Sequence, residues 1–240
     1  MSPEDIKALL VTLGIIAGVV AIVVYQWKAA KQRREDLFAL AAQGGWDFSP
    51  AKDTGIGRLC DFEIFTRGED RCAYNTITGD VQYGPYRCSL DMGDFRYTIK
   101  RRTSKGHRTS TTYHFSYLMV RLPFRDTPQV RIRREGLLDS ITQALGFEDI
   151  DFESEEFSRK YCVTSQDKKF AYALLHARAM EYFLAIEPPE LIELASGRIM
   201  VTDGLRRWPV ESFRKRMTWA KHFIALWPEH LARDLQPRRT

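Results

Sequence analysis

The chain contains one uninterrupted apolar stretch, from Ala8 to Tyr25, with no charged side chain in 18 residues. In a helix these residues rise roughly 27 Å, close to the hydrocarbon thickness of a bilayer. A helix in the core of a soluble domain would carry polar residues on one face, and this stretch has none. In lipid, a helix satisfies every backbone hydrogen bond within a single segment. We therefore predict a membrane-spanning helix, with assigned residues Ala8, Leu9, Leu10, Gly14, Gly18, Val24 and Tyr25.

The two ends of this stretch indicate an anchor that is kept rather than a signal peptide that is cleaved. A secretory signal begins with Lys or Arg and ends at a cleavage site of small residues. Here Glu4 and Asp5 oppose a single Lys7, and the far end runs into Tyr25 and Trp27, which are typical of the membrane interface. Basic residues follow at Lys28, Lys31, Arg33 and Arg34.

These basic residues predict the orientation of the anchor. Lys and Arg beside a membrane helix are retained on the cytoplasmic side, so we expect a single-pass protein of the bacterial inner membrane with its main domain in the cytosol. The four cysteines, at positions 60, 72, 88 and 162, show no C-x-x-C spacing and agree with a reducing compartment. The opposite orientation would allow two disulfides.

Gly14 and Gly18 form a G-x-x-x-G pattern on one face of the predicted membrane helix. Small residues at this spacing let two helix backbones approach closely, which would permit a homodimer. Glycine is also common in membrane helices without any partner, so both interpretations stay open.

The positive charge is concentrated near the predicted anchor. Residues 1–34 carry five basic and two acidic side chains, whereas the rest of the chain carries 31 and 29. A nearly neutral domain lacks the bulk positive charge of nucleic-acid-binding proteins, so we predict no nucleic-acid partner.

The predicted organisation is an anchor (1–27), a juxtamembrane helical stalk (28–45) and a cytosolic domain (46–240). In the stalk, Leu37, Phe38 and Ala41 are expected to face the domain, and the glycine pair 44–45 is expected to end the helix. Residues 46–134 alternate short runs rich in aromatic and β-branched residues with turn sequences, which predicts antiparallel strands. "LCDFEIFTR" (59–67) is assigned to a strand, "YGPY" (83–86) and "DMGD" (91–94) to turns, and residues 95–122 to a long hairpin with a basic tip.

The second half of the domain is expected to mix helices with a further hairpin. We predict helices at 135–145, 168–185 and 209–235, the last kinked at Pro228. Phe170, Leu174, Ala177 and Phe183 are expected to form the buried stripe of the second helix. A strand is expected at 159–164 and a hairpin turn at Ser196–Gly197. The expected fold class is α+β: a mostly antiparallel sheet covered by helices after an N-terminal transmembrane helix.

The sequence offers little enzymatic chemistry. Asp149, Asp151, Glu153 and Glu155 would line one face of a strand, but a solvated edge or linker explains them better than a cation site. None of the five histidines has metal-ligand spacing, and no G-x-S-x-G or P-loop motif occurs. We therefore predict no catalytic residue, no cofactor and no metal.

Two basic groups stand out against this background. Arg101 and Arg102 belong to the predicted hairpin tip, and Arg214 and Arg216 to the polar face of the last helix. Near an anionic leaflet each such charge contributes about 1 kcal/mol of attraction. These four residues are the candidate contacts to lipid or to a partner; ordinary solvated surface is the alternative.

The segment "DIDFESEEFSRKYCVTSQDKKFAYALL" (149–175) resembles a family of uncharacterised bacterial proteins with an N-terminal membrane anchor and a β-rich cytosolic domain. Its matching features are the acidic lead-in, the strand around Tyr161 and Val163, the Asp167 turn and the helix that begins near Phe170. The resemblance extends over about residues 35–205 and implies no activity and no catalytic residue.

Three functions follow as hypotheses. The first is a non-enzymatic protein-interaction module held at the inner membrane. The second is an anionic-lipid headgroup-binding module, similar in layout to a pleckstrin-homology domain. The third is an enzyme with an unrecognised site, which would need a deep pocket where several polar side chains converge.

Overall fold

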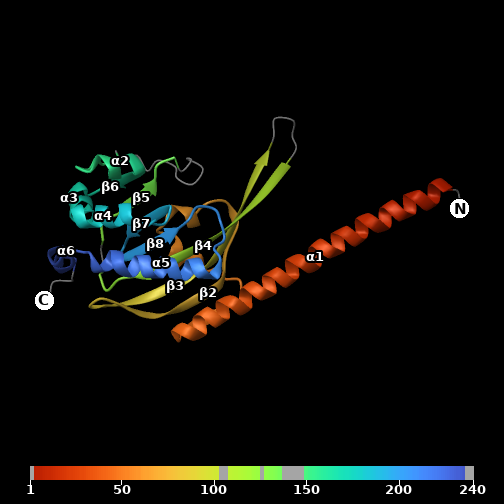
Figure 1. The fold of residues 1–240 in the computed structure, drawn as a ribbon, viewed down its shortest axis with the longest axis horizontal. Helices are drawn as coiled ribbons and strands as arrows, with labels where there is room; N and C mark the ends of the chain where they lie inside the picture. The colour runs from red at the N-terminus through yellow and green to blue at the C-terminus, as the bar shows by residue number, and fades with distance from the viewer. Residues whose placement is uncertain (1–2, 103–107, 125–126, 137–148, 236–240) are drawn as a thin grey trace.

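The computed structural model describes residues 3–102, 108–124, 127–136 and 149–235. Its first element is the helix α1 (Pro3–Gly44), which continues without interruption from the apolar stretch into the predicted stalk. At the helical rise its 42 residues measure about 63 Å. Figure 1 shows α1 as a rod whose C-terminal part lies along the domain and whose N-terminal part projects far beyond it.

The last turns of α1 belong to the domain core. Leu37, Leu40 and Ala41 are buried, whereas Phe38 is 61% exposed. The Phe38 ring makes an edge-to-face contact with Phe48, with 6.1 Å between the ring centroids. Leu40 therefore takes the inward position that the sequence assigned to Phe38. The glycine stop is confirmed: Gly45 has φ +66°, a conformation that glycine adopts without strain, and it ends the helix.

The domain is built on one eight-stranded sheet, which confirms the α+β prediction. Its order is β1-β2-β3-β4-β8-β7-β5-β6, and every neighbouring pair is antiparallel. The strands are β1 (Asp47–Ser49), β2 (Glu69–Tyr83), β3 (Tyr86–Arg102), β4 (Arg108–Arg121), β5 (Val130–Arg134), β6 (Tyr161–Ser165), β7 (Leu191–Ala195) and β8 (Arg198–Thr202).

Two predicted hairpin turns are confirmed. β2 and β3 are joined through Gly84, which has φ +58°, and β7 and β8 are joined through Ser196 and Gly197. Ser196 and Gly197 both have positive φ, at +48° and +69°. A two-residue turn with positive φ at both positions matches the right-handed twist of the flanking strands.

Alternation along the strands gives the sheet two buried faces. On β8, Ile199 and Val201 belong to the larger core, while Met200 between them belongs to the smaller core on the other face. The α-helices among the described residues all pack on the larger-core side. They are α1, α2 (Glu155–Lys160), α3 (Lys168–Leu174), α4 (Ala177–Ala185), α5 (Val210–Ala225) and α6 (Glu229–Asp234).

The smaller core corrects one prediction. The run "LCDFEIFTR" has the composition of a strand, but it begins at the last residue of the 3-10 helix η1 (Ile56–Leu59) and contains a second one, η2 (Glu63–Phe65). Leu59, Phe62, Ile64 and Phe65 are almost fully buried. A strand would point alternate side chains to solvent, whereas this compact segment turns all four toward the second face of the sheet and covers it.

Two predicted helices are each divided in the structure, and one predicted turn does not form. The helix predicted at 168–185 is two helices, because the chain breaks at Leu175–His176; Ala177 is exposed, and Ala179 is buried in its place. The helix predicted at 209–235 also breaks, with Pro228 as the N-cap of α6. "DMGD" (91–94) lies inside β3 and forms no turn.

The acidic run likewise forms no continuous strand. Asp149 makes an isolated bridge to Thr164, and Ser154 caps the start of α2 by accepting a hydrogen bond from the Phe157 amide at 3.2 Å. The four carboxylates therefore do not share one strand face. Most of the helix predicted at 135–145 lies outside the described residues.

Candidate functional site

The junction between α1 and the sheet is built on a buried ion pair. Arg33 donates from Nε to Oδ2 of Asp94 at 2.7 Å and from Nη2 to Oδ1 at 2.5 Å. Its Nη1 donates to the Trp208 carbonyl oxygen at 2.7 Å. The Asp94 carboxylate is fully buried and also accepts hydrogen bonds from Ser116 Oγ and Asn75 Nδ2, at 2.7 and 3.1 Å. One residue of the helix is thus tied to three segments of the domain.

Local backbone features of β2 and β3 create the place for this carboxylate. The register between the strands shifts between Tyr74 and Ile77, and Asn75 in this irregularity has φ +51°. Gly93 lies beside it: a Cβ atom there would be 2.9 Å from the Asn75 carbonyl oxygen and 3.0 Å from Thr76 Cα. Glycine is therefore required for the close approach of the two strands next to Asp94.

The charge state of the pair follows from its surroundings. Burial disfavours the charged guanidinium of Arg33, but the hydrogen bonds and negative charge of Asp94 outweigh it and raise the pKa of Arg33. The Arg33 guanidinium therefore stays charged at neutral pH. Removing either partner of a buried pair leaves an uncompensated charge, which costs about 3–5 kcal/mol.

The four basic residues predicted to flank the membrane do not act alike. Lys28, Lys31 and Arg34 are exposed, whereas Arg33 is held by Asp94. Arg33 is therefore a structural contact of the domain, and its place beside a membrane stays a prediction. Leu37, Leu40 and Ala41 also pack into the core of the domain that was expected to begin at 46.

The predicted membrane segment lies entirely within α1. Among the described residues, α1 is the one helix long and apolar enough to cross a membrane, with a mean hydropathy of 1.7 over its most apolar window. Ala8 and Leu9 lie in this helix, and Leu10, Gly14, Gly18, Val24 and Tyr25 are exposed along it. A Cβ atom on either glycine would meet nothing within 4 Å, and homodimerisation through this face stays a prediction.

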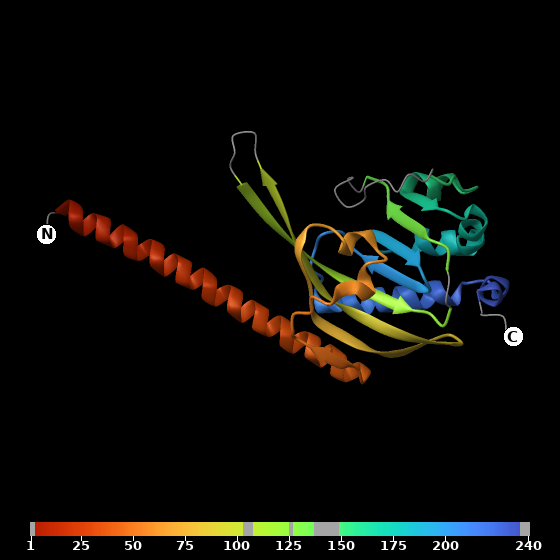
Figure 2. The same ribbon diagram turned by 180° about the vertical axis from the view of Figure 1, so that it is seen from behind.

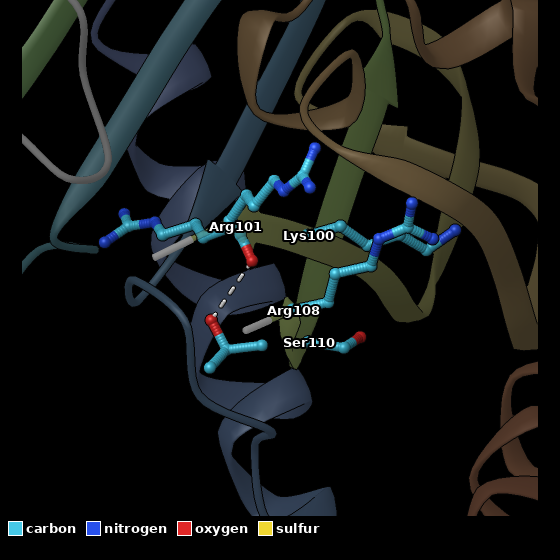
Figure 3. A pocket seen from close by; sticks show the side chains of 6 residues that line it. Lys100, Arg101, Arg108 and Ser110 are labelled. Atoms are coloured by element: carbon cyan, nitrogen blue, oxygen red, sulfur yellow. Dashed lines mark hydrogen bonds between the residues drawn. The ribbon is translucent and has the colours of Figure 1, made fainter. Parts of the chain in front are cut away.

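The hairpin predicted to carry a basic tip is a two-stranded arm. β3 and β4 remain paired as far as Arg102 and Arg108, which lie directly opposite each other. A depression of about 310 Å³ is lined here by Lys100, Arg101, Arg102, Arg108, Thr109 and Ser110. Figure 3 shows the side chains of Lys100 and Arg108 pointing to the same side of the arm. The described part of the arm therefore offers a cluster of cations around a cavity large enough for a phosphate group.

A second hollow lies between α4 and α5. Its volume is about 590 Å³, and its lining includes Tyr182, Ile186, Arg214, Trp219 and His222. Tyr182 stacks on Trp219, with 6.2 Å between ring centroids, and burial raises the pKa of the Tyr182 hydroxyl to about 12. Ile186 is 46% exposed at its rim. We call this feature the α4–α5 groove.

The four candidate contact residues therefore fall into two separate places. Arg101 and Arg102 line the arm, whereas Arg214 and Arg216 line the α4–α5 groove. Arg216 is largely buried and forms an ion pair of 2.8 Å with Asp203, so it contributes little free charge. The single basic surface expected of a headgroup-binding domain is not formed by all four.

Sequence reasoning missed Asp94 altogether. The one local signal was an acidic residue directly before the strand-like run "FRYTI", but its neighbours Asp91 and Gly93 favoured a turn. Among the described residues, no three His, Cys, Asp or Glu side chains group as a metal site would require. All four cysteines are free, and three of them are buried.

No family model matches the sequence, and no curated protein matches it. Comparison with solved structures finds similarity to the crystal structure of the mycobacterial trehalose monomycolate transport factor A, TtfA. The TM-score is 0.53 at 14% sequence identity, and the match covers 88% of this chain and 98% of the other. The two proteins therefore share a fold.

Proposed function

We propose that this chain is a membrane-anchored, non-enzymatic accessory protein of a transport process, whose cytosolic domain binds a partner membrane protein. The observation that carries the proposal is the Arg33–Asp94 contact, because it holds the domain in one orientation on an unbroken helix. An enzyme that acts on soluble substrates does not need its domain to be held in one orientation on a helix. A protein that must meet a second membrane protein gains preorganisation, which lowers the entropic cost of binding.

The link to transport comes from the shared fold with the mycobacterial transport factor, whose own description names trehalose monomycolate transport. We extend to this chain only the general role, transport at a membrane, and leave its cargo open. The basic residues Lys28, Lys31 and Arg34 support placement of the domain on the cytosolic side of a bacterial inner membrane. Membership of the uncharacterised anchored family is part of the same proposal.

The α4–α5 groove is the surface we assign to the partner. Aromatic residues and arginine are enriched at the centres of protein interfaces, and the groove combines Tyr182, Trp219 and Arg214 with the exposed Ile186. Arg214 donates a hydrogen bond of 2.5 Å to Gln43, near the end of α1. Gln43 lies 18 residues beyond Tyr25, or about 27 Å along the helix. The groove therefore suits the cytosolic part of a neighbouring membrane protein better than the lipid itself.

Site-specific crosslinking tests this assignment. A photoreactive residue at position 186 of the full chain, activated in native membranes, should crosslink to one reproducible membrane protein identified by mass spectrometry. The matched control is Gln82, an exposed residue at the β2–β3 turn, where no crosslink to that protein is expected. Ile186→Arg should reduce co-purification of the same protein at least about tenfold, as expected for an interface anchor, and Gln82→Arg should not. Equal crosslinking from both positions would refute the assignment.

A further inference from the structure

Among the described residues, no third strand pairs with the outer part of the β3–β4 hairpin, which we call the β3–β4 arm. β2 pairs with β3 only as far as Thr98, and β8 pairs with β4 only from Leu118 onward. Beyond Thr98 the arm is an isolated two-stranded ribbon whose side chains are exposed or partly exposed. Such a ribbon is marginally stable in water, so a long projecting arm is expected to rest on another surface.

The charges on the arm indicate the chemistry of that surface. Arg102 and Arg108 form a direct cross-strand pair of like charges, which is destabilising in the absence of a counter-ion. Lys100 lies on the same face and pairs with Glu69 at 2.7 Å. Among the described residues no carboxylate forms an ion pair with Arg101, Arg102 or Arg108, and the sequence holds no acidic residue between Asp94 and Asp126. Within the part of the chain that the structure describes, Glu69 and Asp70 supply negative charge to Lys100, whereas Arg101, Arg102 and Arg108 have no such counter-ion.

The lengths of β3 and α1, measured from their contact, show how far the arm reaches relative to the apolar part of α1. Strand β3, which continues into the arm, and helix α1 meet at the Arg33–Asp94 contact. From Arg33 back to Tyr25, the end of the apolar stretch, α1 rises about 12 Å. From Asp94 to Arg101, β3 extends about 23 Å. Figures 1 and 2 show the arm and the N-terminal part of α1 projecting from the same side of the domain. The arm is thus long enough to reach the level at which α1 enters the bilayer.

We propose that the β3–β4 arm is a second membrane contact, in which Lys100, Arg102 and Arg108 bind the phosphates of anionic lipid headgroups in the cytosolic leaflet. The inference rests on the proposed membrane anchor, and it adds a lipid-binding site to the proposed function. Two contacts prevent the domain from turning about the axis of α1. The arm therefore determines which way the α4–α5 groove faces within the plane of the membrane.

The test uses the full chain reconstituted in vesicles. A Cys60→Ser, Thr111→Cys background places an environment-sensitive dye on the arm, and lipids with a spin-labelled headgroup serve as quenchers. We expect strong quenching in vesicles with about 30% phosphatidylglycerol and weak quenching in phosphatidylcholine alone, because each cation strengthens association roughly fivefold near an anionic surface. Salt at about 1 M should remove the difference, since the screening length falls to about 3 Å.

The decisive variant is Arg102→Glu, Arg108→Glu. It keeps a like-charge pair between the strands and reverses the sign of that pair. The electrostatic repulsion within the ribbon, and hence its stability, should therefore change little. Quenching in anionic vesicles should fall to the level seen in phosphatidylcholine. The control Lys221→Glu, Arg233→Glu makes the same change in net charge on exposed residues of α5 and α6 outside the α4–α5 groove and should leave quenching unchanged.

Three results would overturn the proposal: equal quenching in the two kinds of vesicle, no effect of the arm variant, or an equal effect of the control variant in α5 and α6. Release of the arm by inorganic phosphate at constant ionic strength would also overturn it, because a free anion would then be the ligand. Loss of arm quenching while the Ile186 crosslink persists would remove this inference and leave the proposed partner function intact.

Discussion

Arg33 and Asp94 lie 61 positions apart in the sequence and meet through two hydrogen bonds of 2.7 and 2.5 Å. This contact joins the long apolar helix α1 to the folded domain. A flexible linker would let the domain turn in any direction relative to the helix. A buried arginine on a continuous helix, held by two hydrogen bonds to one carboxylate, instead fixes the orientation of the domain relative to α1. If α1 is the membrane anchor that we propose, this contact sets the distance of the domain from the membrane and the direction of its arm.

The first prediction concerns this pair. Arg33→Met keeps most of the apolar stem but leaves the Asp94 carboxylate buried without its counter-charge. We expect the free energy of unfolding to fall by about 3–5 kcal/mol. Urea denaturation of the full chain in a non-ionic detergent, followed by tryptophan fluorescence, measures the change.

The neighbouring Arg34 provides the control. Arg34 is exposed and donates only to the Ala30 carbonyl oxygen of its own helix, so Arg34→Met should cost less than about 0.5 kcal/mol. Arg33→Met combined with Asp94→Asn should recover part of the loss, because the neutral amide no longer buries a charge. Equal effects of Arg33→Met and Arg34→Met would contradict the importance of the pair.

The second prediction concerns the close approach of β2 and β3. Gly93→Ala would place a Cβ atom 2.9 Å from the Asn75 carbonyl oxygen, and the backbone there cannot rotate away. The strands must separate beside Asp94, which we expect to cost about 1–3 kcal/mol. Gly57→Ala in η1 is the matched control, because a Cβ atom there meets nothing within 4 Å. Thermal unfolding of the two variants should differ clearly; the same melting temperature for both would count against this reading of Gly93.

Much of this fold could be predicted from the sequence, because it depends on local patterns. Hydropathy identifies α1, alternation identifies the antiparallel strands, and Ser196–Gly197 identifies a two-residue turn. Each of these signals lies within a few residues of the element that it specifies. The candidate arm was also predicted, because a basic segment between two strand-like runs is a local pattern.

The Arg33–Asp94 contact could not be predicted in the same way. It depends on the register of β2 against β3 and on the irregularity at Asn75, which are properties of the assembled sheet. Gly93 and its acidic neighbours have the composition of a turn, yet they serve a close strand approach instead. Phe62 and Phe65 likewise have strand-like composition, but burial on the second sheet face overrides local propensity.

The third prediction concerns pH. Burial, together with the positive charges of Arg207 and Arg96, lowers the pKa of His114, whose Nδ1 lies 3.0 Å from the Tyr74 hydroxyl oxygen. The folded state therefore disfavours the protonated ring. The stabilising contribution is complete above the unfolded value of about 6.5 and is lost as the pH falls through the lower folded value.

The His114→Gln variant isolates this contribution. Because the ring is only partly buried, we expect the wild type to lose no more than about 1 kcal/mol relative to His114→Gln as the pH falls from about 7.5 to 5. Urea denaturation at several pH values measures the difference, and the other histidines cancel in the comparison. Parallel stability curves for the two proteins would show that His114 titrates as it does in the unfolded chain.

The fourth prediction concerns the reactivity of the thiols. Burial raises the pKa of Cys88 to about 11, and burial with a hydrogen bond to Asp149 raises the pKa of Cys162 to about 12. Cys72 is buried and Cys60 is exposed. Because the thiolate is the reactive form, the folded protein near pH 8 should be alkylated at Cys60 alone. All four thiols should react after unfolding, as counted by mass spectrometry; alkylation of Cys162 before unfolding would contradict the structure.

The same exposed thiol tests the orientation of the anchor. With the domain in the cytosol, a membrane-impermeant maleimide should label Cys60 only after the cells are permeabilised. A Glu4→Cys variant in a Cys60→Ser background carries the single exposed thiol at the other end of α1 and should be labelled in intact cells. The two positions thus predict opposite outcomes for one reagent, so the result does not depend on labelling efficiency. Labelling of Cys60 in intact cells would place the domain outside, where anionic lipid of the cytosolic leaflet is beyond the reach of Arg102 and Arg108.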